Sequence, residues 1–150
     1  MNPMPSSTPT LNEQFEERAD HAVATLTGSG SLEQAAHAVQ RALVTARERN
    51  IKRLLVDARQ LGGFPSPTLA DRYFIVRRWA TEVGKRVELA IVLEQHILDP
   101  DRFGVMVAAN LGMRADAFSS TVEALEWLRS GQPAAVVIAA QQTCKNNQAK

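Results

Sequence analysis

The chain has 150 residues, of which 45% are apolar, 22% charged and 5% aromatic, and its formal net charge is +1. That length fits one domain with a buried core, and the composition excludes collagen-like, disulfide-scaffold and wholly disordered chains. The near balance of 17 basic and 16 acidic residues argues against a surface that follows nucleic-acid phosphates or an anionic membrane.

Cysteine and histidine are too sparse to build a disulfide or a zinc site. The single cysteine, Cys144, lies in a polar tail and has no partner for an internal disulfide, as is typical of a reducing, cytoplasmic compartment. The histidines, His21, His37 and His96, are scattered without the spacing of metal ligands. We therefore expect neither a metal nor a cofactor.

The two ends of the chain differ in composition from its centre. Residues 1–12 begin with MNPMPSSTPT and are predicted to be a disordered leader, because they lack the basic start and apolar segment of a signal peptide. Residues 13–131 are predicted to form the domain, and 132–150 a C-terminal extension. The apolar run AAVVIAA at 134–140 is far shorter than the roughly 20 residues of a membrane-spanning helix. It is predicted to add an edge strand or to cover a partner's surface.

The first predicted elements are a hairpin and a helix. The sequences EQFEER (13–18) and HAVATLTG (21–28) are typical of two short strands. Apolar residues then recur at steps of three and four, which indicates an amphipathic helix. Ser31 and Gln34 predict a capping box at its start, and Asn50 a left-handed residue at its end.

A buried strand and a second helix follow. IKRLLVDA (51–58) is continuously apolar at its centre, which is typical of a strand covered on both faces. The next helix is predicted over 67–83, with Ser66 as its N-cap and Pro67 at the first helical position. Gly84 is predicted to end it.

The rest of the domain continues the alternation. Four elements are predicted: a strand at 86–94, a helix that begins at Asp99 and Pro100 and ends at Gly112, a strand at 114–120, and a helix at 121–131. Ser120 and Glu123 predict a capping box for the last helix. A hairpin followed by alternating helix and strand predicts a single-domain α/β fold with a mixed, mainly parallel sheet and packed helices.

Several short motifs have residues that occur in sites for anions or cations. GSGS (28–31) precedes a helix as a phosphate cradle would, but it lacks the third glycine of a dinucleotide motif and the Lys-Ser/Thr pair of a P-loop. A strand-to-helix turn is the favoured interpretation. Asp99 and Asp101 fall at a predicted helix start, where the helix dipole favours acids. The basic residues are not interleaved with aromatic residues, so nucleic-acid binding is not expected.

A nucleophilic site has weaker support. The chain has no G-x-S-x-G elbow. Ser66, His96 and either Asp57 or Asp99 supply the residue types of a triad, but three such types are expected by chance in a chain of this length. We therefore predict no catalytic residue.

Three stretches resemble the STAS/SpoIIAA-like family of small bacterial proteins: RLLVDARQLGG…DRY, ELAIVLE and DRFGVMVAANLGMRADAFSSTVEALEWL. The last stretch carries the matching positions Arg102, Phe103, Gly104, Asn110, Gly112, Phe118 and 124–128. The likeness covers about residues 13–130 and is greatest to an uncharacterised stand-alone branch. It implies a mixed or mainly parallel sheet with helices, and a binding role without catalysis.

The resemblance also points to one loop. Well-known relatives are anti-sigma-factor antagonists, which bind a kinase partner and carry a phosphorylatable Ser in an Asp-Ser-Ser-Gly run after the equivalent strand. Here FPSP (64–67) occupies that place, and Ser66 is its one hydroxyl. Ser66 is interpreted either as a helix cap or as a modifiable group. The candidate interaction or switch loop comprises Gly62, Gly63, Phe64, Ser66 and Thr68.

These observations predict a non-catalytic, cytoplasmic regulatory or protein-interaction module of bacterial STAS-like type, with an unknown protein partner. One alternative is a carrier of a lipid or small apolar ligand, suggested by lipid-carrying proteins of related fold. Another is an uncharacterised small α/β enzyme. The run at 134–140 and an apolar face carrying Phe74 and Trp79 predict a homodimer.

Overall fold

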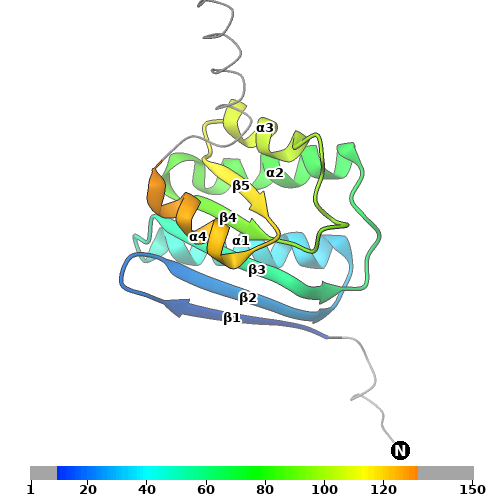
Figure 1. Cartoon of the computed structure of the whole chain (residues 1–150), viewed down its shortest axis with the longest axis horizontal. Coiled ribbons are helices and arrows are strands. Elements are labelled where there is room, and N and C mark those ends of the chain that lie inside the picture. Colours follow the sequence, from blue (N-terminus) through cyan, green and yellow to red (C-terminus); the bar gives the residue numbers. More distant parts are fainter. Residues whose placement is uncertain (1–9, 132–150) are drawn as a thin grey trace, which may run out of the picture.

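The computed structural model describes residues 10–131, which form one five-stranded sheet in the order β1-β2-β3-β4-β5 (Figure 1). β1 (Leu11–Glu17) and β2 (Ala22–Ser29) form an antiparallel hairpin. β3 (Arg53–Gly62), β4 (Glu88–Val92) and β5 (Ala115–Phe118) then extend the sheet in parallel. The predicted mixed, mainly parallel sheet is therefore confirmed, whereas the predicted edge strand at 134–140 lies outside the described residues.

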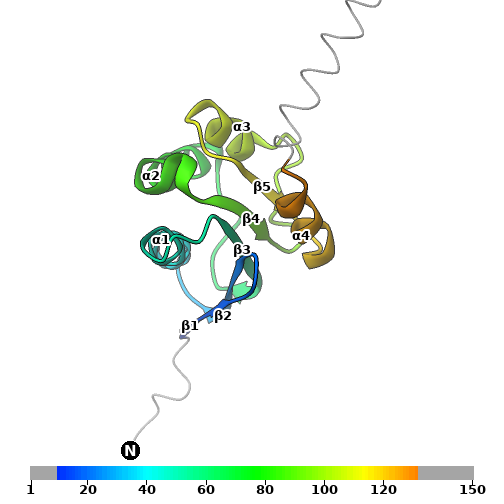
Figure 2. The same ribbon diagram turned by 90° about the vertical axis from the view of Figure 1, so that its left-hand side faces the viewer.

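Helices cover both faces of this sheet, as Figure 2 shows. α1 (Leu32–Glu48), α2 (Leu69–Val83) and α3 (Phe103–Asn110) lie on one face, and α4 (Thr121–Ser130) lies on the other. A short 3-10 turn, η2 (Gly84–Arg86), links α2 to β4. Within residues 10–131, no helix combines the length and apolar character needed to cross a membrane.

The continuous apolar run of β3 is explained by cores on both sides of the sheet. Leu54 and Val56 point into the larger core under the three helices, and both are fully buried. Leu55 points the other way, into a smaller core that includes Ala124 and Leu128 of α4. Because successive side chains of a strand alternate between faces, a strand buried on both sides must be apolar at every position.

The start of α1 matches the sequence pattern and the start of α2 does not. Ser31 and Gln34 form the predicted capping box, with the Ser31 hydroxyl accepting from the Gln34 N–H at 3.1 Å. α2, in contrast, begins at Leu69 with Thr68 as its N-cap. Thr68 Oγ1 accepts from the Asp71 N–H at 3.0 Å, and the Asp71 carboxylate accepts from the Thr68 N–H at 2.9 Å. The predicted cap at Ser66 is therefore wrong, because the reciprocal pair two residues later satisfies two backbone N–H groups.

α3 also begins later than predicted. Asp99 does not start the helix directly: its carboxylate accepts from the N–H groups of Asp101 and Phe103, so the chain makes a turn first. The N-cap is Arg102, in the left-handed conformation at φ 55°. At α4, Ser120 is the N-cap and its hydroxyl accepts from the Glu123 N–H at 3.3 Å, which is one half of the predicted capping box.

Two strands are longer than their sequence patterns indicated. β1 begins at Leu11, two residues before the predicted start. β3 continues to Gly62, four residues past the predicted end, because Gln60, Leu61 and Gly62 still pair with β2 after a register shift. Gly62 is thus the last residue of a strand, and the candidate loop proper spans 63–68.

Candidate functional site

The candidate loop is held to the preceding strand-to-helix turn by a close backbone approach. The Gly30 N–H donates to the Gly62 carbonyl at 3.0 Å. Gly63 has φ 96°, and a Cβ on it would overlap the Ser29 hydroxyl and press on the backbone of Gly30. The glycines of the GSGS motif and those of the loop therefore meet each other. This packing supports the interpretation of GSGS as a turn.

The loop residues differ sharply in burial. Phe64 is half-buried and packs against the larger core, whereas Ser66 is exposed. Thr68 is exposed and its hydroxyl is used as the helix cap. Once Thr68 is the cap, the Ser66 hydroxyl is left without the structural role that the sequence suggested for it.

Phe64 and Pro67 also line an apolar cavity of about 160 Å³ between the sheet and the helices α1, α2 and α3. Its wall includes Ile97, Leu98 and Asp99 from the loop that follows β4. In Figure 1 this loop and the candidate loop both run up the right-hand side of the molecule. Both leave the carboxyl ends of parallel strands, which is where α/β proteins commonly bind ligands. The cavity and the candidate loop therefore form one site.

Four of the residues around the cavity are charged, and the others are apolar or glycine. The four are Arg72, Asp99, Arg102 and Asp116. Arg72 donates to the Ile97 carbonyl at 3.0 Å, which ties α2 to the loop after β4. Burial opposes ionisation of Asp99, but the N–H groups of Phe103 and Asp101 and the nearby cations together hold the pKa of Asp99 below its usual value.

Arg102 and Asp116 form an ion pair at this wall. Asp116 is buried, and its carboxylate also accepts from the Ala117 N–H at 2.8 Å. Burial lowers the pKa of the Arg102 guanidinium from its ordinary value, and the charge of Asp99 opposes that shift. The Arg102 Nε is buried, and no residue in the range 10–131 accepts a hydrogen bond from it.

The carboxylates considered for a catalytic triad are used elsewhere. Asp57 pairs with Arg59, whose Nε donates to it at 3.0 Å and whose guanidinium lowers the pKa of Asp57. Asp99 binds backbone N–H groups, and His96 is exposed. Among the described residues, no group of three or more His, Cys, Asp and Glu could hold a metal ion.

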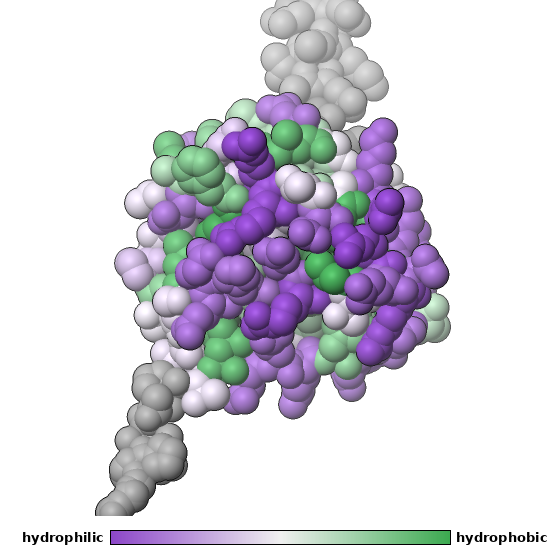
Figure 3. Space-filling model, turned by 180° about the vertical axis from the view of Figure 1, so that it is seen from behind, coloured by the Kyte–Doolittle hydropathy of each residue, from purple (hydrophilic) through white to green (hydrophobic). Residues whose placement is uncertain are grey.

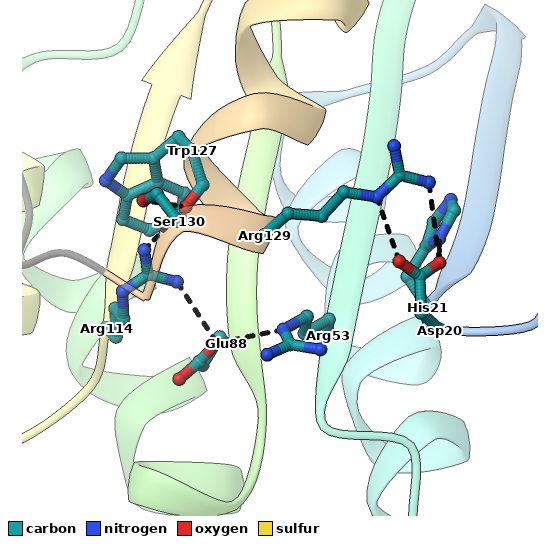
Figure 4. A network of polar contacts seen from close by, with 8 residues as sticks. All are labelled: Asp20, His21, Arg53, Glu88, Arg114, Trp127, Arg129 and Ser130. Carbon is teal, nitrogen blue, oxygen red and sulfur yellow. Dashed lines mark hydrogen bonds and ion pairs between the residues drawn. The ribbon is translucent and has the colours of Figure 1, made fainter.

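A second polar cluster lies at the opposite end of the strands and connects α4 to the sheet (Figure 4). Arg114 donates to Glu88 at 3.0 Å and to the Trp127 carbonyl at 2.6 Å, and its guanidinium lies 3.8 Å from the centre of the Trp127 ring. Nearby, Arg129 donates to Asp20 at 2.9 Å. These contacts join groups within the protein, which indicates that the cluster stabilises the position of α4.

The apolar face predicted for the second helix is smaller than expected. Trp79 is only 8% exposed, and its indole N–H donates to the Ala36 carbonyl of α1 at 3.0 Å. Phe74, by contrast, is 60% exposed, and exposed apolar side chains also occur at Leu69, Tyr73 and Met106. Figure 3 shows this face of the molecule as mostly hydrophilic, with apolar residues in several separate places, including its upper part.

Comparison with known proteins identifies the fold. No family model matches the sequence, and no curated protein matches it either. Among solved structures, an anti-sigma-factor antagonist from Mycobacterium paratuberculosis is similar at a TM-score of 0.54 with 13% identity, covering 80% of this chain and 95% of that one. The chain therefore has a STAS/SpoIIAA-like fold, which confirms the resemblance at the level of the fold.

A second solved structure is an uncharacterised protein with a SpoIIAA-like fold from Shewanella loihica. Its TM-score is 0.48 at 18% identity, and the match covers 84% of this chain and 99% of that one.

Sequence reasoning found the loop but missed most of the cavity wall. Arg102 is one of the positions that carry the family resemblance, whereas no sequence motif points to Asp116. A signal for both existed in DRF and RADAF, where charged residues stand directly beside predicted buried positions. A lone polar residue next to a core position is informative because it must find a partner when buried.

Proposed function

We propose that the chain is a non-catalytic regulatory module that binds a protein partner through the loop 63–68. The observation that carries this proposal is the exposed Ser66, whose hydroxyl does not cap α2. The similar anti-sigma-factor antagonist has the same fold, which adds support to a regulatory role. A phosphate on Ser66 would add about two negative charges two residues before the N-cap of a helix. Such a charge would change the surface that a partner meets.

The two aspartates that could serve a catalytic triad already bind other groups of the protein, which supports a role without catalysis. A general acid or base needs a pKa near the working pH and a free proton-transfer path. The pKa values of Asp57 and Asp99 are instead lowered, by Arg59 and by backbone N–H groups respectively. Both carboxylates therefore stay ionised at neutral pH and remain hydrogen-bonded to Arg59 or to backbone N–H groups. The alternative of a small α/β enzyme has no comparable supporting observation.

The experiment is affinity capture with the full chain and three variants, each followed by identification of the captured protein. Ser66→Ala should retain the partner, because it removes only a hydroxyl. Ser66→Glu should lose it, because it places a charge at the contact. Ser119→Glu, at an exposed serine before α4, is the matched control and should retain the partner. Capture of the same protein by Ser66→Glu at an unchanged level would contradict the proposal, and so would the absence of any specific partner.

A second candidate function, the binding of a small apolar ligand, is favoured by the cavity beneath the loop. Apolar pockets with a few polar groups are the usual form of small-molecule sites. Native mass spectrometry of the chain purified from its source should show a ligand-bound species that is lost on denaturation. A mass equal to that of the bare chain in repeated preparations would count against this candidate.

A further inference from the structure

β5 lies at one end of the five-stranded sheet, and its outer edge carries backbone groups with which a further strand could pair. The Leu93 N–H donates to the Phe118 carbonyl, so the even-numbered residues of β5 face β4. Because alternate residues of a strand direct their N–H and C=O groups to opposite sides, those of Ala115 and Ala117 point away from β4. Edges of this kind are sites at which chains associate unless something protects them.

The outward backbone groups of Ala117 are already bound by side chains. Its N–H donates to the Asp116 carboxylate at 2.8 Å, and its carbonyl accepts a long hydrogen bond from the Arg102 guanidinium at 3.5 Å. The same terminal nitrogen of Arg102 also contacts the Asp116 carboxylate, so the three residues form a closed set of contacts. A strand that arrived at this edge would have to displace the guanidinium before it could pair with Ala117.

The Arg102–Asp116 pair reaches around the edge of the sheet. Phe118 packs in the smaller core under α4, and Asp116, two residues earlier, starts on the same face because strand side chains alternate. Arg102 is the N-cap of α3, which lies on the other face (Figure 2). The Arg102 side chain therefore has to pass over the edge of β5 to meet Asp116.

This arrangement is costly for the fold, which indicates a specific role. Asp116 is buried, and a buried carboxylate needs a compensating cation. Arg102 has φ 55°, a backbone state that residues with side chains seldom adopt. An apolar pair of similar volume would often stabilise a fold as well or better. Inward-pointing charges on an edge strand are, however, one of the ways in which proteins prevent pairing with another chain.

The topology disfavours closure of this edge by the run at 134–140. α1, α2 and α3 connect successive parallel strands on one face, whereas α4 lies on the other (Figure 2). α4 ends beside the start of β5, because Arg114 donates to the Trp127 carbonyl at 2.6 Å. A strand that followed directly and paired with the outer edge of β5 would run parallel to it. The connection through α4 would then be a left-handed crossover, which is rare.

We propose that the Arg102–Asp116 pair keeps the β5 edge of the sheet closed, so that neither a second copy of the chain nor another extended segment adds to it. The other edge strand, β1, is protected differently, by the charges of Glu13, Glu16 and Glu17. β5 has the sequence ADAF, in which Asp116 is the one charged residue, so its edge depends on the pair. This role is separate from partner binding by the loop 63–68.

A double variant removes the pair without leaving a buried charge. Arg102→Met with Asp116→Leu puts apolar side chains of similar size in place of the ion pair, an exchange that other proteins tolerate. The variant should keep the circular dichroism spectrum of the wild type. At tens of micromolar it should sediment as larger species than the wild type does at the same concentration. Adding Ala117→Pro, which removes the outward N–H at an edge position that tolerates proline, should restore wild-type sedimentation.

The matched control removes an ion pair of the same kind from β3. Asp57→Leu with Arg59→Met adds the same two apolar side chains, but β3 lies between β2 and β4, so no edge is opened. This control should sediment as the wild type does. Equal association of the control would mean that added apolar surface drives association, and would overturn the proposal. Unchanged sedimentation of the Arg102→Met, Asp116→Leu variant would also overturn it, as would association that persists with Ala117→Pro.

Amide hydrogen exchange of the wild type tests the pair even if the variants do not fold. The Arg18 N–H donates to the His21 carbonyl, so the even-numbered residues of β1 face β2 and the Phe15 N–H points outward. After correction for intrinsic rates, the Ala117 N–H should exchange at least about tenfold more slowly than the Phe15 N–H, because a carboxylate accepts from it. Equal rates would overturn the proposal, and so would nuclear Overhauser contacts between residues 134–140 and the outer edge of β5.

Discussion

At the scale of single residues, Gly62 and Gly63 stand next to each other in different environments. Gly63 has φ 96° and faces Ser29 and Gly30, whereas a Cβ on Gly62 would meet no atom within 4 Å. Gly63→Ala should therefore lower the free energy of unfolding by about 1–3 kcal/mol, because it forces a side chain into a left-handed, crowded position. Gly62→Ala should change it by less than about 1 kcal/mol. Urea denaturation of the two variants measures the difference, and equal losses would contradict the close approach.

A second pair of residues tests which hydroxyl caps α2. Thr68→Ala should cost about 1 kcal/mol of stability, because the Asp71 N–H loses its acceptor. Ser66→Ala should have an effect within about 0.5 kcal/mol, since Ser66 is exposed and does not cap the helix. Thermal or urea unfolding under identical conditions decides between them. A larger loss for Ser66→Ala would restore the cap position predicted from the Ser-Pro pair.

The residues of the site were only partly predictable. Phe64 and Ser66 were found because they fall at a loop between two strongly patterned elements. Arg102 was visible as part of a motif, but its positive φ and its pairing with Asp116 depend on how β5 and α3 meet in space. No local pattern encodes a contact between residues 14 positions apart in different elements, so only the structure could join them.

At the scale of elements, the helix starts predicted from the sequence are wrong where two possible N-terminal signals lie close together. Ser66-Pro67 and Thr68-x-x-Asp71 are both helix starts, and the second prevails because its reciprocal hydrogen bonds satisfy two backbone groups. Asp99-Pro100 likewise signals a helix start, but the Asp99 carboxylate stabilises a turn and the helix begins at Phe103. The longer extent of β3 comes from pairing with β2, which local propensity does not show.

The attachment of α4 to the hairpin turn should depend on pH. Arg129 and His21 hydrogen-bond to Asp20 and hold the pKa of Asp20 well below its usual value (Figure 4). A carboxylate with a lowered folded pKa contributes stability above the unfolded pKa of about 3.9, and that contribution is lost as the pH falls. Asp20→Asn should therefore be less stable than the wild type at pH 7, and the difference should shrink below about pH 4.

Urea denaturation of the wild type and Asp20→Asn between pH 2 and 7 measures this effect. Arg129→Gln should reduce stability in the same pH range, because it removes the strongest partner of Asp20. Parallel stability curves for Asp20→Asn and the wild type across the whole range would show that the Asp20–Arg129 contact contributes nothing.

At the scale of the whole molecule, the architecture could be predicted because several patterns along the chain indicate it independently. Strict alternation of helix and strand implies crossovers, and crossovers imply a parallel sheet. The face on which each helix lies was not encoded so simply. The cavity arises because α1, α2 and α3 share one face and leave unfilled space against β2, β3, β4 and β5. Such a space is a property of packing among five or more elements, and no single segment carries its signal.

The homodimer stays a prediction. Because Trp79 is buried, the exposed apolar residues of α2 and α3 are the surface through which we expect two copies to associate. The exposed residues Leu69, Tyr73 and Phe74 would pair with their copies across a two-fold axis. Sedimentation of the full chain at tens of micromolar should show a dimer, and Phe74→Glu should convert it to a monomer. Val122→Glu, at a residue 66% exposed on α4, is the control and should remain dimeric. A wild-type chain that sediments as a monomer would contradict the prediction.

The order of the strands across the sheet is the same as their order along the chain. During synthesis each strand therefore emerges beside the edge that it will join, and none has to insert between two strands already paired. Translation can thus build the sheet outward, one edge at a time, from the hairpin to β5. β1 is one edge throughout, and the other edge at any moment is the newest strand; open apolar edges invite association between chains. The chain is most exposed to such association between the synthesis of Val92, which completes β4, and that of Ala115, which begins β5. During this interval β4, an interior strand of the finished sheet, has no neighbour on one side.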